Sequence, residues 1–496
     1  MEVQQEKREY QKLFNTTFIF GGVQVFSILI SLVRNKIVAV LLGTAGMGFM
    51  GLLTNPLGFI SLLTGLGIAL SAIRDIAAAN ETGDQIKLSS TLKTFRRWVW
   101  FTGLLGMLTV IVLSPWLSQF SFGNRDYVWA FLLISITLLI NEISSGQSAI
   151  LKGIRRIKDV AIVGVWGSAV GLVVSIPFYY FYGMKGIVPA SIIASFAGLF
   201  FSWYYSRKVK TVPVQLSYKE SYLQGKAMVK LGIATSINFL IGNGISYFLI
   251  TYIRSRGGLD EVGLYNAGWN ITNQYVGLIF TAIAADLYPR LAGVHTNISK
   301  IKEVISQQGE IVILMIAPIM LLYLTSLPII IPLLLKKEFL AIMPFAQWMV
   351  IGMLLKAASW PMSYITLAKG DTKFYFFLEG ILNNGFQLIA FVVCYYYFGL
   401  EGIGIAFFII YILYFALIIF VGNKRYQVYY SKTFYKMLAF QLLLCTIAFL
   451  FVYFFKYPVG FISGGILLII SSLYSYKELN KRIDIKDFVL SKIRRK

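Results

Sequence analysis

Long apolar runs separated by short polar segments make up most of this chain. A helix of about 20 residues crosses the ~30 Å hydrocarbon core of a bilayer, so runs of this length predict transmembrane helices. The pattern therefore predicts an all-α, polytopic membrane protein with about fourteen spans. These lie near residues 14–41, 47–73, 98–116, 127–149, 159–182, 186–206, 228–253, 264–288, 304–335, 340–368, 373–398, 402–422, 436–455 and 458–476.

Composition supports this class. The chain is 57% hydrophobic and only 14% charged, with a mean hydropathy of +0.71, whereas soluble domains are about half apolar and a quarter charged. The chain has one histidine, and both cysteines, Cys394 and Cys445, fall inside apolar runs. We therefore expect free buried thiols, no metal site and no bound cofactor.

The net charge of +23 would suggest a nucleic-acid partner on a soluble protein. Its distribution indicates another cause. With the N-terminus in the cytoplasm, 35 of the 45 Lys and Arg residues fall in predicted cytoplasmic segments or at the cytoplasmic end of a span, seven in external loops and three deeper inside spans. Such a bias follows the positive-inside rule. It predicts cytoplasmic termini and makes a nucleic-acid partner unnecessary.

The spans divide into two sets of six and a final pair. We predict an N-lobe at 1–208, a basic cytoplasmic linker at 209–227, a C-lobe at 228–425, and an additional helix pair with a basic tail at 426–496. A weak repeat supports the division, since Gly46 and Gly51 recur further along the chain, both at the same interval, as Gly263 and Gly268. Six helices per repeat would give both copies the same orientation in the membrane.

Charges inside spans are costly and normally face a cavity or a partner. In the first span Thr17, Gly21, Gln24, Ser27, Ser31 and Arg34 follow spacings of three and four residues, which places them on one helix face. This stripe favours Arg34 as an anion-binding group in a wet cavity, although an arginine reaching the outer headgroups is the alternative. Lys36 lies about 200° away from the stripe, so it either reaches the headgroups or contacts another helix.

The second lobe carries its own intramembrane cation. Lys356 lies near the middle of the tenth span, and Glu379, Asn383 and Gln387 form an i, i+4, i+8 stripe on the eleventh. A Lys356–Glu379 ion pair has two interpretations that the sequence leaves open. It either holds the lobe together or balances a substrate-binding cation while the site is empty.

Glu142 is the most isolated buried acid of the first lobe. Two roles remain open for it: carrying a coupling proton, because burial favours the neutral carboxyl, or pairing with Arg34 or Arg74. In the eighth span Asn266, Asn270, Asn273 and Gln274 form an amide row. Such rows bind helices together more often than they bind sugars. Intramembrane cations suit an anionic ligand such as pyrophosphate, and amides suit hydroxyl-rich glycans.

Three stretches resemble the signatures of the Wzx O-antigen and lipid III flippases. They run from Arg34 to Gly48, from Val262 through Tyr275 to Leu291, and from Trp348 through Lys369-Gly370 to Glu379. The resemblance covers about residues 12–425. Lipid II flippases also have fourteen helices, but their local motifs match this sequence less well.

The resemblance implies the multidrug/oligosaccharidyl-lipid/polysaccharide exporter superfamily, with two six-helix lobes around a central cavity and alternating access. It implies a flippase of undecaprenyl-pyrophosphate-linked oligosaccharide in the bacterial inner membrane, not an enzyme, with coupling to H⁺ or Na⁺. Lys36 and Lys356 stand at basic positions of the family pattern, Glu379 at its glutamate, and Arg74 near a basic position. The resemblance leaves open the polysaccharide polymerase machinery as a partner.

Three alternatives remain. A drug or cation antiporter of the same superfamily should place carboxylates in its cavity, and Lys356 and Arg34 weigh against it. A membrane-embedded glycan polymerase or ligase usually carries a large external loop, and the predicted external loops here reach only about a dozen residues. A scaffold without transport accounts for the helices but not for the polar stripes.

Overall fold

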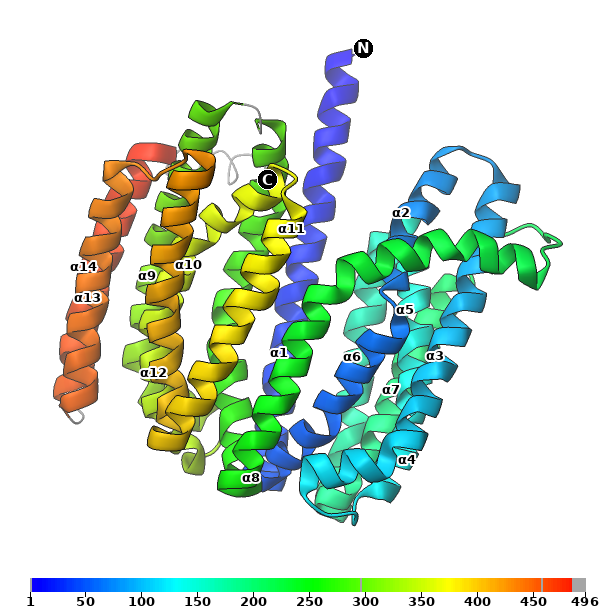
Figure 1. Cartoon of the computed structure of the whole chain (residues 1–496), viewed down its shortest axis with the longest axis horizontal. Helices are drawn as coiled ribbons and strands as arrows, with labels where there is room; N and C mark the ends of the chain where they lie inside the picture. Colours follow the sequence, from blue (N-terminus) through cyan, green and yellow to red (C-terminus); the bar gives the residue numbers. More distant parts are fainter. Residues whose placement is uncertain (1, 295–296, 456–457, 484–496) are drawn as a thin grey trace. The chain divides into compact units, whose positions relative to one another are not determined.

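The computed structural model describes residues 2–294, 297–455 and 458–483, without the side chains of 2–28, 234–235, 274–286, 288–289, 292 and 372. Within this part of the chain every regular element is helical (Figure 1). The elements are α1 Glu2–Gly65, α2 Ile68–Glu81, α3 Gln85–Phe122, α4 Val128–Ile134, α5 Ile136–Gly153, α6 Ile157–Tyr182, η1 Gly183–Gly186, α7 Ile187–Ser206, α8 Tyr218–Gly293, α9 Ile298–Leu334, η2 Lys337–Ile342, α10 Met343–Ala368, α11 Thr372–Tyr375, η3 Phe376–Asn383, α12 Asn384–Tyr426, α13 Lys432–Phe454 and α14 Val459–Ile483.

Ten stretches of the described chain are long and apolar enough to cross a membrane. This confirms the prediction of an all-α, polytopic membrane protein. Four of the ten include at least part of two predicted spans: one joins α6 and α7, and the others bend sharply at Gly43, Gly258 and Gly399. Division at these points accounts for the difference between ten stretches and fourteen predicted spans.

Four glycines form the corners between successive helical segments. Gly43, Gly183, Gly258 and Gly399 have φ between 55° and 78° and extended ψ values, a combination that only glycine adopts readily. Each lies in or beside a predicted external loop. Gly258 follows Gly43 at almost the same interval as Gly399 follows Gly183, so the backbone itself repeats with nearly the period suggested by the sequence.

The chain forms two compact units, Met1–Gly263 and Leu264–Lys496. The division falls inside α8 and not in the basic segment before it. The boundaries predicted for the lobes, the linker and the C-terminal segment therefore stay a prediction. In the first unit α3, α5, α6 and α7 pack side by side (Figure 1). In the second unit α10 packs on α9 and α12, and α13 and α14 pack on α9.

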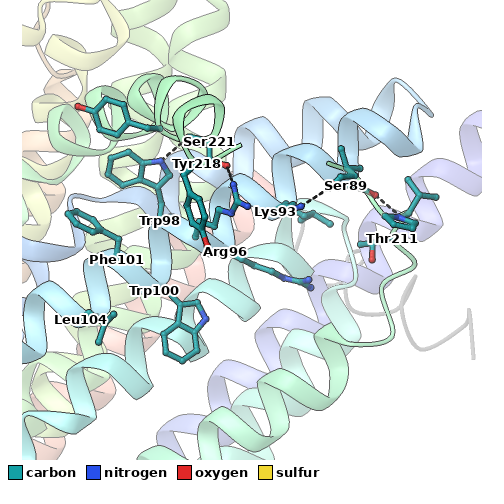
Figure 2. A pocket seen from close by; sticks show the side chains of 16 residues that line it. Ser89, Lys93, Arg96, Trp98, Trp100, Phe101, Leu104, Thr211, Tyr218 and Ser221 are labelled. Atoms are coloured by element: carbon teal, nitrogen blue, oxygen red, sulfur yellow. Dashed lines mark hydrogen bonds between the residues drawn. The ribbon is translucent and has the colours of Figure 1, made fainter. Parts of the chain in front are cut away.

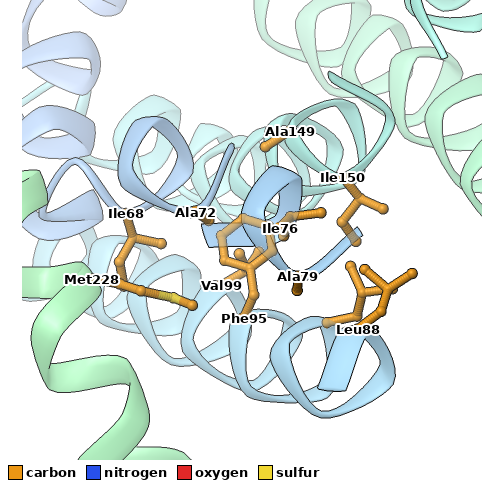
Figure 3. Close-up of a cluster of buried hydrophobic side chains, with 11 residues drawn as sticks. Ile68, Ala72, Ile76, Ala79, Leu88, Phe95, Val99, Ala149, Ile150 and Met228 are labelled. Carbon is orange, nitrogen blue, oxygen red and sulfur yellow. The ribbon is translucent and has the colours of Figure 1, made fainter. Parts of the chain in front are cut away.

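An apolar cluster joins α2, α3 and α5 to the start of α8 (Figure 3). Phe95 and Val99 of α3 are buried in it, together with Ile76 of α2, Ile150 of α5 and Met228 of α8. Because successive residues of a helix are about 100° apart, burial of Phe95 and Val99 turns their neighbours to another face. The cluster therefore determines the orientation of the basic residues at this end of α3.

The last helix pair is tied to the second unit by polar contacts as well as by apolar packing. Arg482 of α14 donates to the carboxylate of Glu310 on α9 over 2.8 Å. Glu310 also accepts from Ser431, the N-cap of α13, over 2.8 Å. One buried carboxylate thus holds both α13 and α14 against α9.

Candidate functional site

Lys356 projects from α10 into an aromatic environment of the second unit. Its ammonium nitrogen lies 5.8 Å from the ring centroid of Phe407 and 5.5 Å from that of Tyr411, both on α12. A cation at this distance is attracted by the ring faces, and more strongly where water is scarce. The residues of α12 therefore stabilise a positive charge at the depth of the predicted tenth span.

Glu379 is the acid of this site and lies in the middle of η3, a π-helical segment. Short π-helical stretches occur preferentially at functional sites. The carboxylate accepts hydrogen bonds from the hydroxyl of Tyr414 and from Asn383, the latter over 3.3 Å. Lys356 and Glu379 interact electrostatically, yet no ion pair within 4.0 Å joins them among the described residues. The carboxylate of Glu379 therefore receives its hydrogen bonds from Tyr414 and Asn383 and not from Lys356.

A group of tyrosines around Glu379 was missed by the sequence analysis. Tyr364 of α10, Tyr375 of α11 and Tyr411 of α12 all interact electrostatically with the same carboxylate that Tyr414 contacts. Tyr411 and Tyr414 are three residues apart and so share one helix face. That spacing was visible in the sequence, but aromatic residues at helical spacing are usually core residues, and only the fold directs this pair toward Glu379.

The amide row of α8 is only partly placed. Asn266 has a buried amide nitrogen without a hydrogen-bond acceptor in the described part of the chain, as expected of a group that awaits a ligand or an ordered water. Asn273 donates to the carbonyl of Trp269 over 2.9 Å, and Asn270 is exposed. The side chain of Gln274 lies outside the described residues. Trp269 connects this row with the lysine site, since its ring packs on Phe407, 6.0 Å between centroids.

The predicted cations of the first unit have no common site among the described residues. Arg34 is exposed on α1, and Lys36, two residues further, is partly buried. Arg74 of α2 has a side chain that is 62% exposed and pairs with Asp75 over 2.7 Å. The polar stripe that favoured Arg34 also includes Thr17, Gln24 and Ser27, and the side chains of these three lie outside the described residues.

Glu142 faces a break between two helices. Its two carboxylate oxygens lie 3.4 Å from the point that a Cβ on Gly65, the last residue of α1, would occupy. No ion pair among the described residues includes Glu142. Arg74 pairs with Asp75 instead. The interpretation in which Glu142 is neutralised by one of these arginines is therefore not supported by this conformation.

The residues of the second unit thus combine a cation, a carboxylate and neutral donors within one buried site. A family model described as "Polysaccharide biosynthesis protein" matches residues 13–295, more than half of the chain. The chain belongs to the polysaccharide biosynthesis protein family.

Solved structures of transporters share the fold of this family member. An inward-facing MATE family multidrug resistance transporter of the MOP superfamily is 18% identical, with a TM-score of 0.68 over 81% of this chain and 94% of that one. The lipid II flippase MurJ in an inward closed conformation is 14% identical, with a TM-score of 0.64 over 94% and 99%. A MOP superfamily transporter from Pyrococcus furiosus is 16% identical, with a TM-score of 0.61 over 83% and 95%.

A comparison with curated proteins finds no match. The polysaccharide biosynthesis protein described here is therefore placed by its family model and by its fold. At identities of 14–18% the solved structures establish the fold alone. They show that this chain shares the fold of these multi-pass membrane proteins, and they leave the substrate to be argued from the residues.

Proposed function

We propose that this polysaccharide biosynthesis protein is a flippase that moves undecaprenyl-pyrophosphate-linked oligosaccharide from the cytoplasmic to the periplasmic leaflet of the bacterial inner membrane. It works by alternating access and makes no covalent change in its substrate. The observation that carries the proposal is Lys356, an intramembrane cation held over aromatic rings without a carboxylate in ion-pair contact among the described residues. Membership of the family supports the same substrate class.

The chemistry of the site supports an anionic, hydroxyl-rich ligand. An ammonium group binds phosphate oxygens as a strong point charge, and charge-assisted hydrogen bonds of this type are about twice as strong as neutral ones. The buried amide nitrogen of Asn266 adds a donor without an acceptor among the described residues, which suits a hydroxyl-rich ligand. Arg34, Lys36 and Arg74 are proposed as further contacts of the pyrophosphate along its path.

We further propose that transport is coupled to H⁺ or Na⁺ through a carboxylate. Glu379 and Glu142 are the acids in question, since neither contacts a cation within 4.0 Å in the described part of the chain, and each lies beside an irregular helical segment. The same observation favours the second candidate function, a cation-coupled multidrug exporter, in which these carboxylates would bind the drug.

Reconstitution in liposomes separates the two functions. Purified protein is expected to expose an undecaprenyl-pyrophosphate-linked oligosaccharide on the far leaflet, and the Lys356→Ala and Arg34→Ala variants are expected to lose this activity while inserting normally. Efflux of a cationic dye without translocation of any lipid-linked sugar would assign the chain to the drug exporters. Full translocation by both variants would refute the cationic site.

A further inference from the structure

The first unit contains a basic cavity that none of the predicted site residues touches. It has a volume of about 880 Å³ and lies between α3, the extended segment 209–217 and the start of α8 (Figure 2). Its lining includes the cations Lys93, Arg96 and Arg97 and no carboxylate. A second cavity of about 650 Å³ shares Arg96 and Trp100 and adds Arg207, again without a carboxylate.

Two of these cations are occupied in holding the segment 209–217 and the start of α8. Lys93 donates to the carbonyl of Val214 over 2.5 Å. Arg97 donates to the carbonyl of Ser217 over 2.9 Å and to the hydroxyl of Ser221 over 2.6 Å, and its guanidinium covers the ring of Tyr218 at 4.2 Å. Their roles are therefore structural, and they also raise the local positive potential.

Arg96 lies between them in sequence and has no such role. Its Nε is buried and has no hydrogen-bond acceptor among the described residues. In Figure 2, Lys93 and Ser89 carry hydrogen bonds to the extended segment, whereas Arg96 carries none. Its neighbour Phe95 is fully buried in the apolar cluster behind it, so α3 cannot rotate to give the guanidinium another partner. A buried donor of this kind calls for an anionic acceptor.

The surroundings indicate that the anion is part of a lipid. Trp100, Phe101 and Leu104 line the larger cavity and are 52%, 55% and 40% exposed on a helix long and apolar enough to span the membrane. They continue from Arg96 along α3 toward the centre of the predicted span. The charge bias predicts that this end of α3 is cytoplasmic, and tryptophan and tyrosine favour the level of the headgroups.

We infer that the cavities around Arg96 form a binding site for the phosphate headgroup of an inner-leaflet lipid, whose chain runs along Trp100, Phe101 and Leu104. Basic pockets between helices on the cytoplasmic side are known to hold anionic headgroups. The shared chemistry is a phosphate attached to a long apolar chain, supplied by an anionic phospholipid or by a prenyl diphosphate. The site is separate from Lys356 and does not depend on the proposed flippase function.

The test is lipid binding to the purified protein, measured by the thermal stabilisation that each ligand causes in detergent. The ligands are dioleoylphosphatidylglycerol, farnesyl diphosphate, dioleoylglycerol as a lipid without phosphate, and inorganic pyrophosphate as a phosphate without a chain. Wild type should be stabilised by one or both phosphate-bearing lipids. Arg96→Gln should weaken that binding at least about tenfold, because hydrogen bonds to a charged group are lost. Lys87→Gln, an exposed cation on the same helix, should bind as wild type does.

The pattern of binding identifies the source. Stabilisation by phosphatidylglycerol alone points to a resident phospholipid, and stabilisation by farnesyl diphosphate alone points to a prenyl diphosphate; either result supports the site. Equal binding by wild type and Arg96→Gln would overturn it, as would equal stabilisation by dioleoylglycerol or by pyrophosphate.

Tryptophan quenching by brominated lipid tests the site without the Arg96→Gln variant, and so does not depend on whether that variant folds. Brominated phosphatidylglycerol quenches tryptophans that its chains touch. Replacement of Trp100 by Phe should remove a component of quenching that is stronger with phosphatidylglycerol than with brominated phosphatidylcholine. Trp116→Phe, at an exposed position near the other end of α3, should remove only quenching that is independent of the headgroup. The same result for both positions would contradict a headgroup site.

Discussion

Gly48 and Gly263 pack against each other's helices in a reciprocal way. A Cβ on Gly48 would lie 2.0 Å from the carbonyl oxygen of Leu259, and a Cβ on Gly263 would lie 1.9 Å from that of Thr44. Each would also lie 3.1 Å from the backbone nitrogen of the other glycine. Gly263 follows Gly48 at the same interval as the corner Gly258 follows the corner Gly43. Within the first compact unit, α1 and α8 therefore meet through residues at equivalent positions of the repeat.

This contact predicts that alanine at either glycine will be destabilising. The added methyl meets backbone atoms on a neighbouring helix, which cannot move as a side chain can, so the segments must separate. Overpacking of this kind costs about 1–3 kcal/mol. We expect Gly48→Ala and Gly263→Ala to lower the thermal unfolding temperature in detergent. Gly242→Ala, on α8 with no atom near its Cβ position, should leave it unchanged or raise it, and an equal loss in all three variants would contradict the argument.

Lys356→Gln should strongly slow translocation without unfolding the protein. The amide retains much of the side chain's volume but removes the charge, and a neutral group is cheaper to bury than an ammonium. We expect the rate of oligosaccharide translocation to fall at least about tenfold, the effect of losing one charge-assisted contact, and Lys356→Arg to retain part of it. Lys336→Gln, at an exposed lysine 3.8 Å from Glu338, serves as the control. Wild-type rates in Lys356→Gln would remove this residue from the substrate path.

Glu379→Gln should make translocation insensitive to pH. Glutamine keeps an oxygen that accepts from Tyr414 but cannot exchange a proton, so a coupling role would be lost while the hydrogen bond remains. Rates measured against a pH gradient should then become flat. Glu401→Gln is a matched control in the same unit, because Glu401 also accepts from a tyrosine, Tyr453, over 2.6 Å. An unchanged pH profile in Glu379→Gln would exclude this carboxylate as the coupling group.

Asp371, in the turn after α10, should give the protein an acid-sensitive contribution to stability. Hydrogen bonds from Arg425, 2.7 and 3.0 Å long, lower the pKa of the Asp371 carboxyl, and Tyr426 adds a third at 2.9 Å. A lowered pKa stabilises the fold above the unfolded-state pKa, about 3.9, and this stabilisation is lost as the pH falls through the folded-state value.

Asp371→Asn should therefore unfold at a lower temperature than wild type at pH 7, and the difference should shrink as the pH falls below about 4. Thermal unfolding of both proteins across this range measures it. Glu338→Gln, in the looser 3.8 Å pair with Lys336, should show little difference at any pH. A gap between Asp371→Asn and wild type that persists at low pH would show that packing, rather than charge, is responsible.

The register of the internal repeat could be predicted only approximately from the sequence. The glycine spacing alone matched Gly46 with Gly263. The structure instead matches Gly48 with Gly263, a slightly shorter interval, since this one superposes both the corner conformations and the close contacts. Glycines are frequent in membrane helices, so their spacing alone defines no register, whereas a positive φ and a missing Cβ at a helix contact do.

For the candidate binding residues, the sequence predicted which side chains matter but not which ones they contact. Lys356 and Glu379 were identifiable because an isolated charge in an apolar run is costly in a membrane and therefore conspicuous. The contact between them could not be predicted. The sequence suggested an ion pair, whereas in the structure Glu379 accepts hydrogen bonds from Tyr414 and Asn383. Arg96 was counted only as part of the positive-inside bias, since cytoplasmic arginines are numerous and nothing in the sequence distinguishes the one that lacks an acceptor.

By itself the sequence determined the class of this protein: an all-helical, multi-pass membrane protein, with predicted external loops at or beside the glycine corners that the structure shows. Those features depend on hydropathy and on local backbone preferences, which act over a few residues. The tertiary structure alone decided which polar groups meet, because a contact between α10 and α12 or between α3 and α8 depends on the rotation of each helix about its axis. Packing of buried side chains such as Phe95 and Phe407 sets that rotation.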